Sequence, residues 1–432
     1  MLSHSPIPIE VVMLTRQSFQ DLKTPVDAYA LGKSPVVDHE GGALRLGGRP
    51  SVLSLQHIGL LAHIASVGVV FGTVYGVIYA VLNNYFAMSA TLVATAQALV
   101  RIPRVLRIVF AAFTDCYPIF GYRRRPYLLL GWGITFVSCL LMAIWPMGAS
   151  ALVDRDASEH GIKLIFLMML ANLGIVVAFG AADGYMVELA QREPEATRGT
   201  VHTTVSAVRY LFMILSAFLT GLGLNGIDYG GSFHWTMGLN GIMGVCAGFA
   251  FATMVLCWFC MTEEKVTSTK SGSQFCKDLF RIIQSRVIYR LIAFRFFRQI
   301  FSHVSVTSDT IFQSQWGHVQ PIHSGIGNML ASVISTVCIM LLKKYGLGWN
   351  WRTIVVGCQL VVLVWAAIPT MLTIWDVCRS PWLLLGLPLL GESPNTIGEV
   401  MPGLYIVEVT ETGFEATMLG LGHRDAVRDC DH

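Results

Sequence analysis

The sequence has few charged residues: only 13% of its 432 residues are Asp, Glu, Lys or Arg, against roughly 25% in a typical soluble domain. Hydrophobic residues make up 54% of the chain. This composition excludes an ordinary soluble domain and indicates a protein embedded in a lipid bilayer. The net charge of +3 says little about partners, because the location of charge matters more than its sum in a membrane protein. We expect the lipid bilayer as a partner and no nucleic acid.

The sequence also lacks the motifs of common enzyme classes. It contains no nucleotide-binding loop of the Walker type, no zinc motif and no nucleophile elbow. Its ten cysteines are scattered singly, mostly inside apolar runs, which is typical of small buried residues and not of disulfides or metal ligands. Cys257 and Cys260 have the spacing of a redox or metal motif, but no second pair accompanies them. We therefore expect no enzyme activity, no cofactor and no metal site.

Apolar runs of about 20 residues, long enough to cross a hydrocarbon core of roughly 30 Å, recur along the chain. They predict an all-α polytopic membrane protein, because the bilayer constrains such a chain to regular, internally hydrogen-bonded segments. A polar segment at 263–290 is too poor in apolar residues to span, and it divides the predicted helices into two groups. The predicted spans are 61–82, 92–113, 127–147, 164–189, 201–224, 235–261, 291–312, 322–342, 354–375 and 382–401.

Lys and Arg residues are distributed unequally between the connections of these spans. The connections after the even-numbered spans, up to the eighth, hold fourteen of them, and the alternate connections hold three. Because positively charged loops stay on the cytoplasmic side, the even-numbered connections and the N-terminus are predicted to be cytoplasmic. Residues 1–56 mix charge, proline and glycine without an apolar core, which predicts a cytoplasmic tail and no cleavable signal peptide.

Sliding the chain on itself indicates two parallel halves. At an offset of 220 residues, 187–188 matches 407–408, and 195–197 matches 415–417. The counterpart of the sixth span would end near position 481, whereas the sequence ends at 432, so we expect ten of twelve spans and a truncated second half. The predicted segments are a cytoplasmic tail at 1–56, a six-helix half at 57–262, a cytoplasmic central loop at 263–290, an incomplete second half at 291–421 and a polar tail at 422–432.

Three arginines interrupt the second predicted span. Arg101, Arg104 and Arg107 are spaced three residues apart, so they lie along one stripe of a helix. With Asp115 at the cytoplasmic surface, the three lie about 21, 16 and 12 Å deep in that order. An arginine deep in a bilayer costs at least ~2.5 kcal/mol, so the stripe is expected to face a cavity and not lipid. Two interpretations stay open: a site for an anionic substrate, or structural pairs with helix carboxylates.

Two carboxylates in the fourth predicted span are candidate partners for these arginines. Asp183 is the deeper of the two and is the better candidate for proton coupling. Glu188 lies five residues later and nearer the surface. It is predicted to pair with Arg123–Arg125 or with Arg198, as a gate or a structural latch.

Further candidates for the cavity are one aromatic residue and two arginines. Tyr75 is placed to stack on a flat heterocycle, although aromatic residues in helices are more often plain packing. Arg209 and Arg298 lie inside predicted spans and are candidate cavity residues. Gly and Pro indicate a helix break or close helix packing at two places. These places are Gly72–Gly76 in the first span and Pro388, Gly391 and Pro394 in the tenth.

One stretch of the sequence is specific enough to indicate a family. It runs from Ile102-Pro103 through Arg107 to Asp115-Cys116-Tyr117-Pro118-Ile119-Phe120-Gly121-Tyr122-Arg123-Arg124-Arg125-Pro126-Tyr127 and Gly131-Trp132. This stretch resembles the signature of the folate-biopterin transporter family, a branch of the major facilitator superfamily. Weaker supporting stretches are 172–199, Trp316 with Pro321, 350–352 and 407–420, so the resemblance covers roughly 54–421.

The resemblance implies the fold of the major facilitator superfamily and the transport of folate, biopterin or related anions, by proton symport or exchange, in the plasma membrane or an organelle membrane. Two departures from the family pattern are the arginine at position 107, where a lysine is usual, and the absence of the last two helices. The alternatives are a non-transporting truncated membrane protein and a transporter of another small solute.

These expectations assign roles to thirteen residues. Substrate binding is expected at Arg107, Arg104, Arg101, Tyr75, Arg209 and Arg298, proton coupling at Asp183, and a cytoplasmic gate at Asp115, Arg123, Arg124, Arg125, Glu188 and Arg198.

Overall fold

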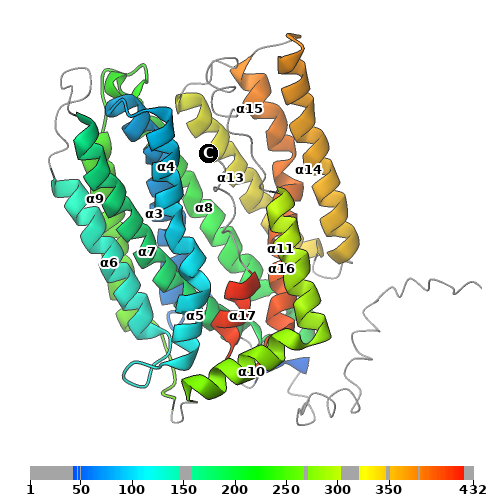
Figure 1. The fold of residues 1–432 in the computed structure, drawn as a ribbon. Helices are drawn as coiled ribbons and strands as arrows, with labels where there is room; N and C mark the ends of the chain where they lie inside the picture. The colour runs from blue at the N-terminus through cyan, green and yellow to red at the C-terminus, as the bar shows by residue number, and fades with distance from the viewer. Residues whose placement is uncertain are drawn as a thin grey trace, which may run out of the picture.

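The described part of the protein is a bundle of helices. The computed structural model describes residues 42–45, 47–48, 50–145, 157–266, 271–302, 321–346, 351–377 and 380–422, and these residues contain no β-strand. In Figure 1 the long helices run roughly parallel, and α10 lies across one end of the bundle. The all-α polytopic architecture predicted from the apolar runs is confirmed.

The first half of the bundle precedes the central polar segment. Its elements are α3 (Ile58–Tyr79), the π-helical turn η2 (Ala80–Tyr85), α4 (Ala90–Arg101), the 3₁₀ turn η3 (Ile102–Leu106), α5 (Arg107–Cys116), α6 (Arg125–Ile144), α7 (Ala157–Ala190), η4 (Glu195–Thr197), α8 (Thr200–Gly223), η5 (Ile227–Tyr229) and α9 (Gly238–Phe259).

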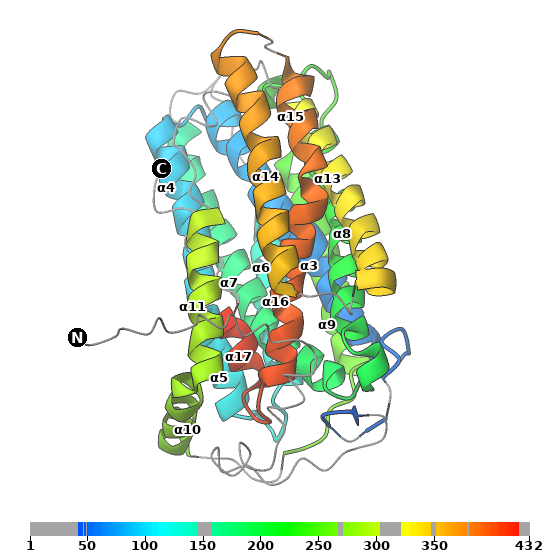
Figure 2. The ribbon, with the colours of Figure 1, turned by 90° about the vertical axis from the view of Figure 1, so that its right-hand side faces the viewer.

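The central segment and the second half contain the remaining helices. Part of the segment expected as a polar loop forms α10, an amphipathic helix that buries Phe275 and Ile282. Figure 2 shows α13, α14 and α15 together along one face of the bundle. The elements are α10 (Gly272–Gln284), α11 (Arg286–Ser302), α13 (Pro321–Leu341), the π-helical turn η7 (Leu342–Gly346), α14 (Trp351–Ile374), α15 (Pro381–Leu390), α16 (Glu392–Val409) and α17 (Glu415–Gly422).

Seven helices among the described residues are long and apolar enough to cross a membrane. They correspond to the first, third, fourth, fifth, sixth, eighth and ninth predicted spans. The other three predicted spans do not form one long apolar helix there. The second and tenth are interrupted, and the described part of the seventh, which belongs to α11, is rich in arginine, while residues 303–312 of that span lie outside the described residues. The predicted total of ten spans and the truncation of the second half stay predictions.

The interruptions correct two expectations. The single helix expected over the second span is wrong, because the chain changes from α4 to the 3₁₀ turn η3 at Pro103, which has no N–H to continue the α-helical pattern. A break at Gly72–Gly76 is also wrong, because α3 is continuous there. These glycines serve close packing instead, since a Cβ on Gly72 would lie 2.4 Å from Oγ of Ser216 on α8.

The break expected in the tenth span is confirmed at Gly391, between α15 and α16.

Helices α6 and α7 cross with their backbones in contact. A Cβ on Gly131 of α6 would lie 2.5 Å from the carbonyl oxygen of Gly174 on α7. A Cβ on Gly174 would in turn lie 2.5 Å from the carbonyl oxygen of Gly131. Such crossings are typical of membrane helices, where small residues let backbones approach and van der Waals packing drives association. Next to the crossing, Trp132 is fully buried.

We expect Gly131→Ala to destabilise the protein by roughly 1–3 kcal/mol, because the added methyl group forces the two backbones apart. Thermal unfolding of the purified protein in detergent measures the change. Gly133→Ala is the matched control, since a Cβ at this position of the same helix meets nothing within 4 Å. Equal unfolding temperatures for the two variants would contradict the close crossing.

The two halves contact each other through several helices. α8 packs along α13, and α17 packs on α5 and α7. A Cβ on Gly325 of α13 would lie 2.7 Å from Cα of Gly221 on α8, so these helices also cross closely. Part of the predicted N-terminal tail also lies against the bundle: the main-chain N–H groups of Leu44 and Arg45 donate to the carbonyl oxygen of Gln191 at 3.0 and 3.1 Å.

Candidate functional site

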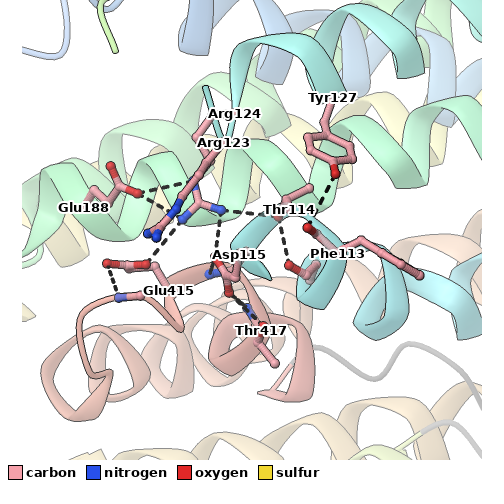
Figure 3. A network of polar contacts seen from close by, with 12 residues as sticks. Phe113, Thr114, Asp115, Arg123, Arg124, Tyr127, Glu188, Glu415 and Thr417 are labelled. Carbon is pink, nitrogen blue, oxygen red and sulfur yellow. Dashed lines mark hydrogen bonds and ion pairs between the residues drawn. The ribbon is translucent and has the colours of Figure 1, made fainter. Parts of the chain in front are cut away.

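The first candidate site is a cluster of buried charges around Arg124, at the start of α6 (Figure 3). The guanidinium is fully buried, and three carboxylates surround it. The separations are 2.8 Å from Nη1 to Oδ1 of Asp115, 2.9 Å from Nη2 to Oε1 of Glu188 and 3.3 Å from Nη2 to Oε2 of Glu415. The cluster therefore joins α5, α6 and α7 of the first half to α17 of the second. We call the end of the bundle that holds it the Arg124 end.

The chain around Arg124 is shaped to hold the guanidinium. Gly184 of α7 leaves the space, since a Cβ there would lie 2.3 Å from Cζ of Arg124. Nη1 also donates to Oγ1 of Thr114 at 3.2 Å. The carboxylate of Glu263 accepts the main-chain N–H groups of Arg123, Arg124 and Arg125 at 2.7–2.9 Å, so it caps the first turn of α6 and fixes the backbone of Arg124.

The same cluster caps the first turn of α17. Asp115 accepts the main-chain N–H of Thr417 at 2.8 Å and its hydroxyl at 2.7 Å. The charge of Asp115 is thus stabilised by the guanidinium and by a helix N-terminus of the other half. Oε1 of Glu415 accepts the N–H of Gly413 at 2.9 Å and Nη1 of Arg45 at 3.1 Å. Asp115 and Glu415 therefore have donors besides Arg124, and Glu188 lies at the partly exposed edge of the cluster. Buried ion pairs need such additional hydrogen bonds to offset the cost of removing the charges from water.

The sequence-predicted gate residues divide into two groups. Asp115, Arg124 and Glu188 come together as expected for a pair between Glu188 and the arginine triplet. Arg198 lies at a second contact between the halves, where Nη1 is 3.5 Å from Oε1 of Glu408 and Nη2 donates to the carbonyl oxygen of Gly42.

The other two arginines of the triplet do not enter the cluster as side chains. Arg125 donates to the carbonyl oxygen of Trp258, and its Cζ lies 5.6 Å from the centre of that indole ring. Arg123 contributes its main-chain N–H to the capping carboxylate of Glu263.

Glu193 forms a third helix cap at the Arg124 end. Its carboxylate accepts the main-chain N–H groups of Gly199 and Val201, both at 2.8 Å, at the start of α8. Burial raises the pKa of Glu193 from 4.5 to about 7, although the backbone donors and Lys343 of the second half act in the opposite direction.

This pKa gives a prediction about stability. Because the folded-state value lies above the unfolded one, the stability that Glu193 contributes is present below pH 4.5 and is lost as the pH rises through about 7. We expect the unfolding temperature of Glu193→Gln, measured by thermal scans in detergent between pH 5 and 8, to fall less with rising pH than that of the native chain. Parallel curves for the two proteins would contradict the raised pKa.

The second candidate site is the ion pair between Arg107, the first residue of α5, and Asp183 of α7. Nε of Arg107 donates to Oδ2 of Asp183 at 3.1 Å, and Nη2 donates to the same oxygen. Each side chain is only 9% exposed. Phe179, one turn earlier on α7, places its ring centre 4.7 Å from Cζ of Arg107. The structure thus joins the predicted anion-binding arginine directly to the predicted proton-coupling carboxylate.

The guanidinium groups of Arg101 and Arg104 both lie over the ring of one tyrosine. Their Cζ atoms lie 5.4 and 4.6 Å from the ring centre of Tyr75 on α3. Cation–π contacts of this kind favour keeping the charge over the ring face. The amide Nδ2 of Asn172, fully buried on α7, donates to the hydroxyl of Tyr75 at 2.7 Å and to the carbonyl oxygen of Val100 at 2.5 Å. Asn172 therefore ties Tyr75 to the end of α4, beside the 3₁₀ turn.

Two further arginines, Arg209 and Arg298, are predicted to line the cavity. Arg209 on α8 is partly buried, with its Cζ 5.0 Å from the ring centre of Tyr210. The side chain of Arg298 lies outside the described residues. Sequence reasoning missed Glu415, Glu263 and Asn172. A signal for Glu415 was present, because it is the first residue of the repeat match at 415–417.

The sequence is similar to those of known membrane transporters. Residues 68–379 match the sequence model of the BT1 family. A folate-biopterin transporter of Synechocystis sp. is 23% identical over 325 residues, which cover 74% of this chain and 61% of the relative. Folate transporter 1 of Plasmodium falciparum is 37% identical over 62 residues, or 14% of this chain and 12% of that protein. The match thus covers about three fifths of the length of the Synechocystis protein.

The fold is similar to that of solved major facilitator superfamily transporters. A D-xylose-proton symporter superposes with a TM-score of 0.59 at 13% identity, covering 84% of this chain and 85% of the symporter. The xylose transporter XylE from E. coli, in a partially occluded inward-open conformation, superposes with a TM-score of 0.58 at 14% identity. The superposition covers 86% of this chain and 90% of XylE. The fold and the family are those of membrane transporters and not of enzymes. With a match over most of its length, this chain belongs to the BT1 family.

Proposed function

We propose that the chain is a secondary active transporter of folate-like or pterin-like organic anions, working by alternating access between its two helical halves. The observation that carries the proposal is the group of arginines inside the bundle: Arg107 in its ion pair, with Arg101 and Arg104 over the ring of Tyr75. Arginines inside a membrane bundle face a polar cavity or an anionic partner, so they favour a site for an anionic substrate. The names of the two relatives, a folate-biopterin transporter and a folate transporter, support this substrate class.

The chemistry of these substrates suits the residues present. A folate carries carboxylates at one end and a flat pterin ring at the other. A guanidinium presents planar donors that match a carboxylate with two hydrogen bonds. The aromatic face of Tyr75 and the guanidinium planes above it suit a flat ring system. Arg209 and Arg298 complete the proposed set of substrate-binding residues.

Proton coupling is part of the proposal, with Asp183 as the coupling residue. While both donors of Arg107 hold Asp183, the carboxylate keeps its charge. An arriving substrate anion competes for Arg107 and weakens its hold on Asp183. A buried carboxylate is costly to keep ionised when a cation withdraws from it, so proton uptake accompanies anion binding. The resulting symport resembles the activity named for the D-xylose-proton symporter of similar fold.

The Arg124 cluster is the proposed gate. It contains residues of both halves, so opening the Arg124 end requires separating α17 from Arg124 and Asp115. The contact between Arg198 and Glu408 would part in the same movement. We assign the Arg124 end to the cytoplasmic side from the excess of Lys and Arg in its connections, in the plasma membrane or an organelle membrane.

Uptake by cells tests the function. Cells that express the full chain are expected to accumulate labelled folate or biopterin above cells with an empty vector. Membrane insertion is checked on the same cells by surface or organelle labelling. Absence of uptake of both compounds by correctly inserted protein would refute the substrate assignment.

A further inference from the structure

One carboxylate in the second half lies midway along the bundle and has no ion pair among the residues that the structure describes. Glu399 on α16 accepts a hydrogen bond from the hydroxyl of Tyr210 on α8 at 3.1 Å. Within the described part of the chain, no Lys, Arg or His nitrogen lies within 4.0 Å of its carboxylate. The contact joins the two halves, since α8 belongs to the first and α16 to the second.

The position of this contact along the helices places it near the centre of a bilayer. Tyr210 lies ten residues after the start of α8 at Thr200, and Glu399 lies ten residues before the end of α16 at Val409. Both of these helix ends are at the Arg124 end, where the side chain of Gln191 donates to the carbonyl oxygen of Thr410 at 2.8 Å. At 1.5 Å per residue, each side chain lies about 15 Å in, half of a hydrocarbon core of roughly 30 Å.

A carboxylate at that depth needs a polar surrounding or a polar ligand, because membrane charges face cavities and partners. Glu399 is only partly buried, and the neutral hydroxyl of Tyr210 uses one of its acceptor positions. A carboxylate has about four such positions on two oxygens. The titratable groups that packed helices bring toward this region are Arg209 and Tyr210 on α8, Cys338 on α13, Cys358 on α14 and Glu392 on α16 itself.

We infer that Glu399 binds a substrate edge that presents two adjacent N–H donors, as the 2-amino-4-oxopyrimidine ring of a pterin does. This inference rests on the proposed function. The first half supplies cations, which suit the carboxylate end of a folate, whereas Glu399 supplies the acceptor pair that the ring end requires. On binding, the N3–H and the 2-amino group donate to the two carboxylate oxygens and displace the hydroxyl of Tyr210.

The geometry makes the choice of ring testable. A 2,4-dioxopteridine presents an acceptor at C2 beside the N3–H, so it fits an amide, which offers one donor and one acceptor, and not a carboxylate. Sites built to hydrogen-bond a particular group reject analogues that leave their polar groups unpaired. Glu399→Gln is therefore expected to reverse the preference, so that the variant favours the 2,4-dioxopteridine over the pterin.

The experiment measures equilibrium binding by calorimetry to the purified full chain, with pterin, the 2,4-dioxo analogue lumazine, and 4-aminobenzoylglutamate, which has no pteridine ring. We expect Glu399→Gln to weaken pterin binding at least about tenfold, to keep or improve lumazine binding, and to leave 4-aminobenzoylglutamate binding within about twofold. Tyr210→Phe keeps the carboxylate and is expected to retain the preference for pterin. Glu411→Gln, the same substitution in the connection between α16 and α17, is the control.

The possible outcomes distinguish failure of the inference about Glu399 from failure of the proposed substrate class. Equal weakening of all three ligands by Glu399→Gln, or no change in the order of preference, overturns the role of Glu399 in ring recognition. Equal weakening would instead indicate a proton-carrying or structural role. If the unaltered chain binds none of the three, the proposed substrate class fails together with this inference, whereas pterin binding that ignores Glu399 refutes the inference alone.

Discussion

Arg124→Met is expected to lower the unfolding temperature on the order of 10 °C and to abolish uptake. The substitution keeps an unbranched side chain but removes the guanidinium, so Asp115, Glu188 and Glu415 lose their common cation. Removing one partner of a buried ion pair costs roughly 3–5 kcal/mol, which corresponds to a temperature change of this size. Thermal unfolding in detergent measures the stability, and labelled folate uptake measures the activity.

The adjacent residue provides the control for this prediction. Arg123 contributes only its main-chain N–H to the helix cap at Glu263, so Arg123→Met leaves that hydrogen bond in place. We expect its unfolding temperature to stay within about 2 °C of the native value. A similar loss in both variants would mean that the triplet acts through its total charge and not through the buried guanidinium at position 124.

Arg107→Gln and Asp183→Asn are each expected to reduce uptake at least about a hundredfold. Each single variant removes one charge of a buried ion pair, at a cost of roughly 3–5 kcal/mol. The double variant replaces both charges with amides that hydrogen-bond to each other, so its unfolding temperature is expected to recover most of the loss. Its uptake is expected to stay low, because the anion-binding cation and the proton-accepting carboxylate are both gone.

The double variant separates the two interpretations of the buried arginines. If the pair between Arg107 and Asp183 is purely structural, uptake recovers together with stability. Lys163→Gln is the matched control, since this residue is an exposed cation on α7, the helix of Asp183. It is expected to leave both stability and uptake unchanged.

Much of the fold follows from local sequence. The span predicted at 127–147 is α6 (Arg125–Ile144), and the one at 235–261 is α9 (Gly238–Phe259). Long apolar runs decide such helices because membrane-spanning backbone must satisfy its own hydrogen bonds. The break of the second span is harder to predict, because Pro103 alone does not say whether the helix kinks or changes to a 3₁₀ turn. Here Asn172 on α7 donates a hydrogen bond to the carbonyl oxygen of Val100, next to the point where α4 changes to the 3₁₀ turn.

The candidate site is less predictable, because its contacts are long-range. Glu188 was expected to pair with one of the triplet arginines, but nothing local distinguishes Arg124 from its neighbours. The distinction comes from Gly184, which leaves the space for this guanidinium, and from Glu415, 291 residues further along the chain. Likewise, the sequence indicated Arg107 and Asp183 as separate candidates, and only the packing of α5 on α7 makes them a pair.

Solute counterflow in proteoliposomes tests the central proposal, that this chain is a folate-type carrier, most directly. Vesicles that contain the purified full chain are loaded with unlabelled folate or biopterin and diluted into a trace of the labelled compound. A carrier that alternates access exchanges internal for external solute, so the label is predicted to rise transiently well above its equilibrium level and then to decline. Label that enters only to equilibrium, or no faster than in vesicles that contain Arg107→Gln protein, would contradict the account.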